Sequence, residues 1–252
     1  MTGQLKKALF FILIIAGWEA VSRTGIWADY LFPSPFSVLA TLFNGFKDGT
    51  FTIAIIASLK RIFKGYLLSL AVGVPMGLLI GRVKFFSETV GSLILGLQTL
   101  PSICWLPLSI LWFGLNEKAI IFIVVIGAIF SISLSTEAGV RNISPLYLRA
   151  AQTMGARGWR IYLEVIIPGA LPSIITGMKL AWSFAWRSLM AGELLSSGVG
   201  LGQVLMVGRD LADMKQVVAV MLIIAILGLT IDRLIFRLLE GQVQQKWGLA
   251  RL

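Results

Sequence analysis

Six long apolar stretches run through the chain, and they decide in which solvent it can fold. They cover approximately residues 8–22, 58–80, 86–112, 118–136, 171–194 and 216–238. An α-helix needs about 20 apolar residues to cross the roughly 30 Å hydrocarbon core of a bilayer, and each stretch is near or above that length. Hydrocarbon offers no partner to an unpaired backbone N–H or C=O group, and none of the stretches alternates like a barrel strand. We therefore predict an all-α membrane protein with about six transmembrane helices.

The composition agrees with a single membrane domain. Of the 252 residues, 57% are hydrophobic and 13% are charged, against about 45–50% and 25% in soluble domains. We expect one transmembrane domain over residues 1–252, with the first span and an outer interfacial segment in 1–55 and the core bundle in 56–240. The net charge of +10 is assigned to membrane orientation and to contact with anionic lipid headgroups, so no nucleic-acid partner is expected.

The basic residues favour one orientation in the membrane. The first stretch resembles a secretory signal, but Trp18, Glu19 and Arg23 follow it where a cleavable signal ends in small residues, so we expect an uncleaved span. The predicted cytoplasmic side then receives Lys6, Lys7, Arg82, Lys84, Arg141, Arg149, Arg157, Arg160, Lys246 and Arg251. The outer side receives Arg23, Lys47, Lys118, Arg209 and Lys215, offset by Asp29, Asp48, Glu117, Asp210 and Asp213. Because basic residues accumulate in cytoplasmic loops, both termini are predicted to be cytoplasmic.

Lys60, Arg61 and Lys64 fall at the outer end of the second span in this topology. A charge at the bilayer centre costs about 2.5 to 3.5 kcal/mol or more. We expect these side chains to snorkel to the outer headgroups from a helix that begins near Thr52. A role in an anion pathway is the alternative.

Several helix breakers interrupt the apolar stretches. Phe32-Pro33-Ser34-Pro35, followed by residues 36–46, predicts a turn and a short amphipathic helix on the outer interface. Glycine and proline also punctuate the second and third spans, at Gly73, Pro75, Gly77, Gly81, Pro101 and Pro107. Such residues predict kinked helices that pack closely, and a flexible gate is the alternative.

The longest predicted cytoplasmic segment, residues 137–172, has the pattern of a helix-turn-helix pair. Ser144-Pro145 predicts a helix start, residues 146–154 a helix, and Gly155 a C-terminal turn. Residues 157–167 predict a second amphipathic helix, which Pro168 and Pro172 should end where the fifth span begins. Small side chains in the first helix leave a surface over which a partner groove could close. Alternatively, the pair lies on the membrane surface.

One motif in this segment resembles the signature of a known family. Arg149-Ala150-Ala151, three residues, Gly155, nine residues and then Val165-Ile166-Ile167-Pro168 resembles the E-A-A-x3-G-x9-I-x-L-P signature of binding-protein-dependent ABC importer permeases. The spacing matches throughout, but Arg149 replaces the usual Glu, Val165 an Ile and Ile167 a Leu. The resemblance looks closest to the aliphatic sulfonate, taurine, nitrate and bicarbonate branch. Further matching stretches are Phe32-Pro33-Ser34-Pro35, Gly73-Val74-Pro75-Met76-Gly77, Leu106-Pro107, Leu111-Trp112-Phe113-Gly114 and Ala191-Gly192-Glu193.

The resemblance implies a role and a set of partners. It implies the transmembrane subunit of an ATP-driven importer for a small anionic solute in a bacterial inner membrane. Two copies would pair, each would insert its cytoplasmic segment into a cleft of one of two ATPase subunits, and a separate extracytoplasmic binding protein would deliver the solute. The implied coupling residues are Arg149, Ala150, Ala151, Gly155, Arg157, Val165, Ile167 and Pro168. Because the sequence has no G-x-x-x-x-G-K-[ST] loop, ATP and Mg²⁺ are expected on the partner and no cofactor on this chain.

Polar residues in and beside the third and fifth spans are candidates for the translocation pathway, because polar groups at that depth are costly and often functional. They are Gln98, Ser102, Trp105, Ser183, Trp186, Arg187, Ser188 and Glu193. Arg187 could attract an anion, pair with Glu193 or snorkel outward.

Two other classes of protein are the alternatives. An enzyme is disfavoured because the sequence has no histidine, no G-x-S-x-G elbow and no cluster of metal ligands. An ion-gradient-driven secondary transporter is the nearer alternative. It predicts several carboxylates in mid-span and inverted repeats, for which Glu19 and Glu193 give little support.

Overall fold

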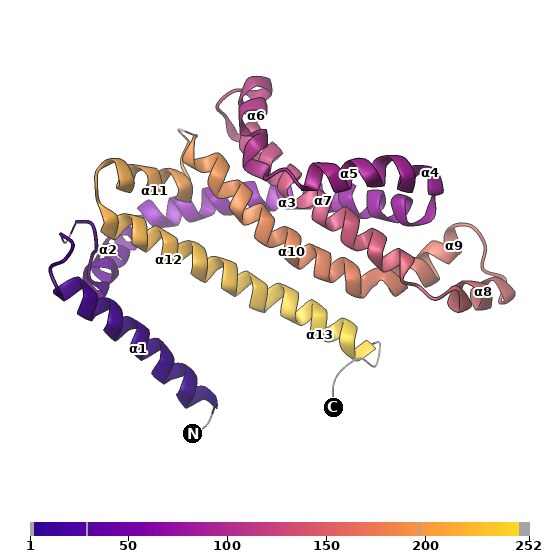
Figure 1. The fold of residues 1–252 in the computed structure, drawn as a ribbon, viewed down its shortest axis with the longest axis horizontal. Coiled ribbons are helices and arrows are strands. Elements are labelled where there is room, and N and C mark those ends of the chain that lie inside the picture. The colour runs from indigo at the N-terminus through magenta and orange to yellow at the C-terminus, as the bar shows by residue number, and fades with distance from the viewer. Residues whose placement is uncertain (1–2, 29, 197, 247–252) are drawn as a thin grey trace. The chain divides into compact units, whose positions relative to one another are not determined.

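A computed structural model describes residues 3–28, 30–196 and 198–246. Every regular element in these ranges is helical (Figure 1). The chain divides into two compact units, Met1–Ser58 with Glu193–Ile226 and Leu59–Gly192 with Leu227–Leu252. The predicted division into residues 1–55 and 56–240 stays a prediction. Of the residues used to predict orientation, Asp29, Arg251 and the side chain of Lys246 lie outside the described part.

The first unit contains two helices that precede the long spans. Its elements are α1 (Gly3–Arg23), α2 (Pro35–Lys47), the start of α3 (Thr50–Arg82), the end of α10 (Ile167–Leu194), α11 (Leu201–Asp210) and most of α12 (Met214–Ile231). The predicted turn and amphipathic helix are confirmed, because Ser34 caps α2 by accepting a hydrogen bond from the Ser37 N–H at 3.3 Å. Val38 is buried on one face of α2, whereas Phe36 and Phe43 are exposed on the other.

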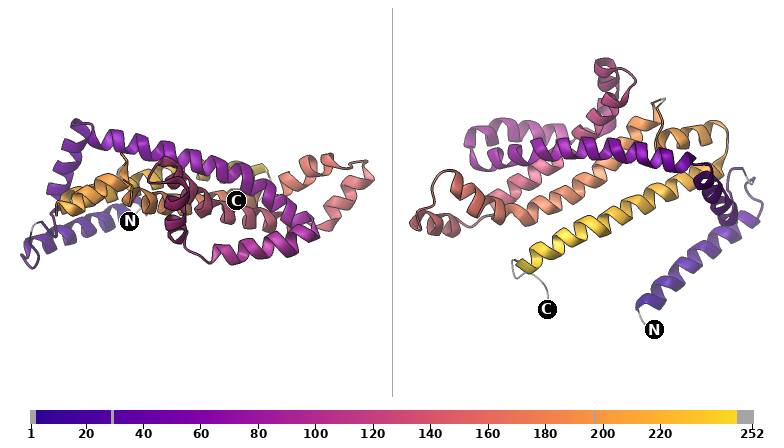
Figure 2. Two further views of the ribbon diagram at one scale, coloured as in Figure 1. Left: turned by 90° about the horizontal axis from the view of Figure 1, so that it is seen from above. Right: turned by 180° about the vertical axis from the view of Figure 1, so that it is seen from behind.

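The second unit holds the remaining helices. Its elements are the rest of α3, α4 (Lys84–Phe86), the π-helical η1 (Ser87–Gly91), α5 (Ser92–Gln98), the 3₁₀-helical η2 (Ser102–Trp105), α6 (Leu106–Phe113), α7 (Glu117–Arg141), α8 (Pro145–Thr153), α9 (Trp159–Ile161), the π-helical η3 (Tyr162–Ile166), most of α10, the end of α12, the π-helical η4 (Asp232–Phe236) and α13 (Arg237–Lys246). The chain reverses after α3, so that α4 and α5 run back beside its second half (Figures 1 and 2).

Helices α3 and α7 pack along a stripe of small residues spaced four apart. The stripe consists of Gly65, Ser69, Gly73, Gly77 and Gly81. A Cβ atom added to Gly77 would lie 2.5 Å from Cβ of Thr136 and closer still to the carbonyl oxygen of Ser133. These backbones approach because their small residues leave space, as in other membrane helix pairs. The predicted close packing is therefore confirmed.

The helices confirm most of the predicted spans. Among the described residues, four helices are long and apolar enough to cross a membrane, namely Thr50–Arg82, Glu117–Arg141, Trp159–Leu194 and Met214–Val243. They correspond to the second, fourth, fifth and sixth predicted spans. The first stretch forms α1, but every 18-residue window of this helix holds at least three charged residues. Its crossing of the membrane stays a prediction.

The third predicted span is not one straight helix. It divides into Lys84–Gln98 and Ser102–Phe113, which meet at an angle of 100°. Pro101 stands at the break and explains it, because proline lacks an N–H donor and disfavours helical backbone at the residue before it. We predicted a kinked helix over residues 86–112, and the structure has instead two helices with a sharp break at Pro101.

Candidate functional site

The hairpin formed by α8, Gly155 and α9 is built from local signals. Ser144 caps α8 by accepting from the Leu146 N–H at 3.3 Å. At the other end, Gly155 has a φ of +89°, which glycine adopts without steric cost. The Gly155 and Ala156 N–H groups donate to the carbonyl oxygens of Gln152 and Ala151 at 3.0 and 2.9 Å. These two bonds form a Schellman motif, which confirms the predicted helix and turn.

The second half of the hairpin continues into the membrane-spanning helix. After α9 and η3, α10 begins at Ile167 and runs to Leu194 without interruption. Pro168 and Pro172 therefore do not end the helix, contrary to prediction. The wide π turn just before Pro168 gives room to a ring that would clash in a regular α-helix. Pro172 sits inside α10, where membrane helices tolerate proline because neighbouring groups compensate for the lost hydrogen bond.

The hairpin has an anchored face and an exposed apolar face. The anchored face includes Leu148 and Ile161, which pack against a buried cluster of Val140, Ile166, Ala170 and Ile174. The exposed apolar residues are Leu146, Tyr147, Met154, Trp159 and Leu163.

A groove of about 400 Å³ runs between α8 and η3, and its lining includes Ala150, Ala151, Met154, Glu164 and Val165. Four of the predicted coupling residues, Ala150, Ala151, Gly155 and Val165, thus lie on or beside one groove, and Arg149 and Arg157 are exposed. Ile167 and Pro168, in the first turn of α10, do not line it, although Val165 and Gly169 on either side of them do.

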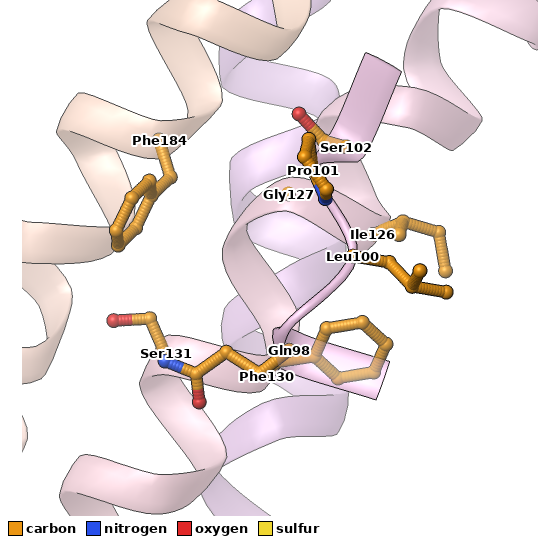
Figure 3. A pocket seen from close by; sticks show the side chains of 9 residues that line it. All are labelled: Gln98, Leu100, Pro101, Ser102, Ile126, Gly127, Phe130, Ser131 and Phe184. Carbon is orange, nitrogen blue, oxygen red and sulfur yellow. The ribbon is translucent and has the colours of Figure 1, made fainter. Parts of the chain in front are cut away.

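A second feature lies at the break in the third span. A cavity of about 140 Å³ is lined there by residues of the break, of α7 and of α10, namely Gln98, Leu100, Pro101, Ser102, Ile126, Gly127, Phe130, Ser131 and Phe184 (Figure 3). Its polar lining comes from Gln98, Ser102 and Ser131, all uncharged. Ser188 of α10 donates a hydrogen bond to the Ser102 Oγ at 2.8 Å. A side chain at Gly127 would collide with the Ser188 Oγ.

The structure brings only part of the predicted pathway set to this cavity. Gln98 and Ser102 line it, and Ser188 reaches it through its hydrogen bond. The Arg187 guanidinium lies 5.6 Å from the ring centre of Phe184, a residue of the cavity wall.

The other predicted pathway residues lie outside the lining. Ser183 is exposed, and Trp186 is buried against Trp182 with ring centres 6.0 Å apart. The indole N–H groups of Trp105 and Trp186 are buried without a hydrogen-bond partner among the described residues.

Sequence reasoning missed the α7 side of the cavity. Gly127 and Ser131 are small residues four apart in the fourth apolar stretch, and Phe130 stands beside them. That spacing is the signal that could have identified a close helix contact there.

Glu193 occupies a separate cluster in the first unit. It is fully buried, and its carboxylate accepts a hydrogen bond from the Ser58 hydroxyl, whose Oγ lies 2.9 and 2.7 Å from its two oxygens. It also accepts from the Gly202 N–H at 3.0 Å. Ser58 was not among the predicted residues, because it is 135 positions away along the chain.

The described helices define a multi-pass, all-helical membrane protein with a helix-turn-helix hairpin that leads into one of its spans. The family model described as binding-protein-dependent transport system inner membrane component matches residues 73–244, and the chain belongs to this family. It is therefore the transmembrane subunit of an ABC importer, a multi-pass inner-membrane permease that is not itself an enzyme. ATP hydrolysis belongs to a separate subunit, and the family name implies a substrate-binding protein as a further partner.

Individual relatives agree with this assignment. A putative ABC transporter permease protein of Methanocaldococcus jannaschii is 38% identical over 88% of this chain and 84% of its own. The putative aliphatic sulfonates transport permease protein SsuC of Bacillus subtilis is 29% identical over 97% of this chain and 88% of its own. A chain of the MetNI methionine ABC transporter, solved in an inward-facing conformation, has the same fold. Its TM-score is 0.64 at 21% identity, over 73% of this chain and 92% of that chain. None of these comparisons supports the ion-gradient-driven alternative.

Proposed function

We propose that this permease carries a small anionic solute of the sulfonate, taurine, nitrate or bicarbonate kind. The similarity to an aliphatic sulfonate permease supports this class of solute. In this proposal two copies pair, both termini are cytoplasmic, and the hairpin of each copy docks on one ATPase subunit that holds ATP and Mg²⁺. A binding protein delivers the solute from the opposite side of the membrane.

The continuity of the hairpin with α10 carries the coupling proposal. The Schellman motif at Gly155 gives the hairpin a defined shape, and its exposed apolar residues offer a surface to a partner. Because α9, η3 and α10 form one helical stretch of 36 residues, a displacement of the hairpin also displaces α10. Closure of the ATPase pair on ATP would then become a rigid-body movement of the spans. Arg149 would face an acidic group of the ATPase.

The cavity at Pro101 supports a pathway next to α7 and α10. Its polar lining offers hydrogen-bond donors from Gln98, Ser102 and Ser131 but no fixed positive charge. A pathway must bind its solute weakly enough to release it. Neutral donors meet that need for an anion, because they contact its oxygens without forming an ion pair. The Arg187 guanidinium lies over the ring of Phe184, which belongs to the cavity lining.

Two substitutions of Gly155 test the coupling role. A β-branched residue is strained at a φ of +89°, whereas asparagine tolerates positive φ better than other residues with side chains. We expect Gly155→Val to lose co-purification with the ATPase and ATP-dependent uptake, and Gly155→Asn to keep most of both. Normal association and uptake in the Val variant would remove the coupling role from this turn.

A further inference from the structure

The amino-terminal end of α11 is capped by side chains of two other helices. Its own N-cap residue, Gly200, has no side chain that could accept a hydrogen bond. Instead, the Leu201 N–H donates to the Ser58 Oγ of α3 at 2.9 Å, and the Gly202 N–H donates to the Glu193 carboxylate of α10 at 3.0 Å. The first two N–H groups of a helix have no partner within it. Here α3 and α10 supply the partners.

The residues around Glu193 are shaped to admit its carboxylate. A Cβ atom added to Gly200 would lie 2.6 Å from the carboxylate atoms, and one added to Gly202 would lie 2.5 Å from the Glu193 Cβ. Ser58, Glu193 and Leu201 are all fully buried. A buried charge is costly unless hydrogen bonds satisfy it, and a negative group is favoured at a helix N-terminus. The Glu193 carboxylate is therefore a hydrogen-bond acceptor in a space that Gly200 and Gly202 leave open for it.

The middle and the carboxyl-terminal end of α11 are also attached. The Gln216 side-chain amide of α12 donates to the Val204 carbonyl oxygen at 2.7 Å. The Asp213 N–H donates to the Gly208 carbonyl oxygen at 2.8 Å, and the Asp213 carboxylate accepts from two N–H groups of the first turn of α12. Helix α11 is thus held at one end by Glu193 and Ser58 and at the other by α12.

Glu193 is the last residue but one of α10, the helix that begins at the hairpin. We propose that Glu193 is a positioning residue that fastens α11 to α10, so that movement of α10 carries α11 with it. This inference rests on the proposed coupling function of the hairpin. Glutamate suits the role because its two oxygens accept from Ser58 and Gly202 together. Alanine would leave the Ser58 hydroxyl and the Gly202 N–H without their acceptor, so that α11 keeps only the cap that Ser58 gives to Leu201.

The test uses the assembled permease, ATPase and binding protein in vesicles, and measures the number of solute molecules taken up per ATP hydrolysed. Glu193→Ala should lower this ratio by about tenfold, the change expected from the loss of one or two buried hydrogen bonds. The ATPase should still co-purify. Glu193→Gln keeps an acceptor for Gly202 in the same space and should restore most of the ratio. Asp210→Asn is a matched control, because it removes a carboxylate from an exposed position of the same helix.

Two results would overturn the inference. One is a wild-type ratio in Glu193→Ala, and the other is an equal loss in the Ala and Gln variants. If Glu193→Ala does not fold, Ser58→Ala and Gly202→Ala replace it, because they disturb the same contacts and should also lower the ratio. A wild-type ratio in both of these variants would likewise overturn the inference. The result with Gly155→Val separates this inference from the proposed function. Normal uptake there refutes coupling through the hairpin, whereas a wild-type ratio in Glu193→Ala alone refutes only the fastening of α11.

Discussion

Replacing Gly77 with alanine should weaken the packing of α3 on α7. The added Cβ would lie 2.5 Å from the Thr136 Cβ, whereas carbon atoms pack at about 3.5–4.0 Å. The helices must therefore separate by roughly 1 Å, and overpacking of this kind costs about 1–3 kcal/mol. Alanine also gains about 1 kcal/mol of helix propensity over glycine. A control must remove that gain from the comparison.

Gly228→Ala is this control, because Gly228 lies inside α12 with open space around its Cβ position. Both variants share the propensity gain, so their difference reports the packing cost of about 2 kcal/mol. In a protein of this size, that corresponds to roughly 4–8 °C in Tm. Thermal unfolding of the purified protein in one detergent, followed by intrinsic tryptophan fluorescence, measures it. Equal Tm values for the two variants would refute the close α3–α7 contact.

Two further changes address the cavity and a charged contact of α10. Gly127→Ala places a methyl group against the Ser188 Oγ and should break its hydrogen bond with Ser102. Vesicle uptake should then fall several-fold while the yield of folded protein is kept, and unchanged uptake would contradict the assignment of the cavity. Lys179→Gln removes a cation that lies 3.4 Å from a Glu240 oxygen and 3.6 Å from an Asp232 oxygen. Both pairs are partly exposed, so we expect a loss below about 1 kcal/mol for each pair that disappears at high salt. A salt-independent Tm change would show another cause.

Local signals in the sequence predicted the hairpin well. Ser144-Pro145 and Gly155 each act through hydrogen bonds to residues within a few positions, so the helix start and the turn follow from the local sequence. The same holds for Ser34 at the start of α2. The stripe of small residues in α3 also predicted close packing, although it did not identify α7 as the partner.

The breaks in the spans could not be assigned from proline alone. Pro101 ends a helix, whereas Pro75, Pro168 and Pro172 lie within helices. The outcome depends on whether neighbouring helices and π turns compensate for the missing N–H donor, and this is a property of the tertiary structure. The prediction that Pro168 ends the second hairpin helix was wrong for this reason.

The position of Glu193 also depended on tertiary structure. Glu193 is a candidate for the pathway from sequence alone because it is an ionisable residue in the fifth span, and buried acids in spans are often functional. Its hydrogen bonds instead go to Ser58 and Gly202, and the first of these partners comes from a distant helix. A pattern read along the chain cannot show which helix supplies the donor.

Uptake through this permease is driven by ATP on a separate subunit. The direct measurement co-purifies the permease with its ATPase, reconstitutes them in vesicles with the binding protein, and follows uptake of alkanesulfonate, taurine, nitrate or bicarbonate. We predict uptake of one of these anions that requires both ATP and the binding protein and is insensitive to dissipation of ion gradients. Uptake that proceeds without ATP and follows a proton or sodium gradient would contradict the account.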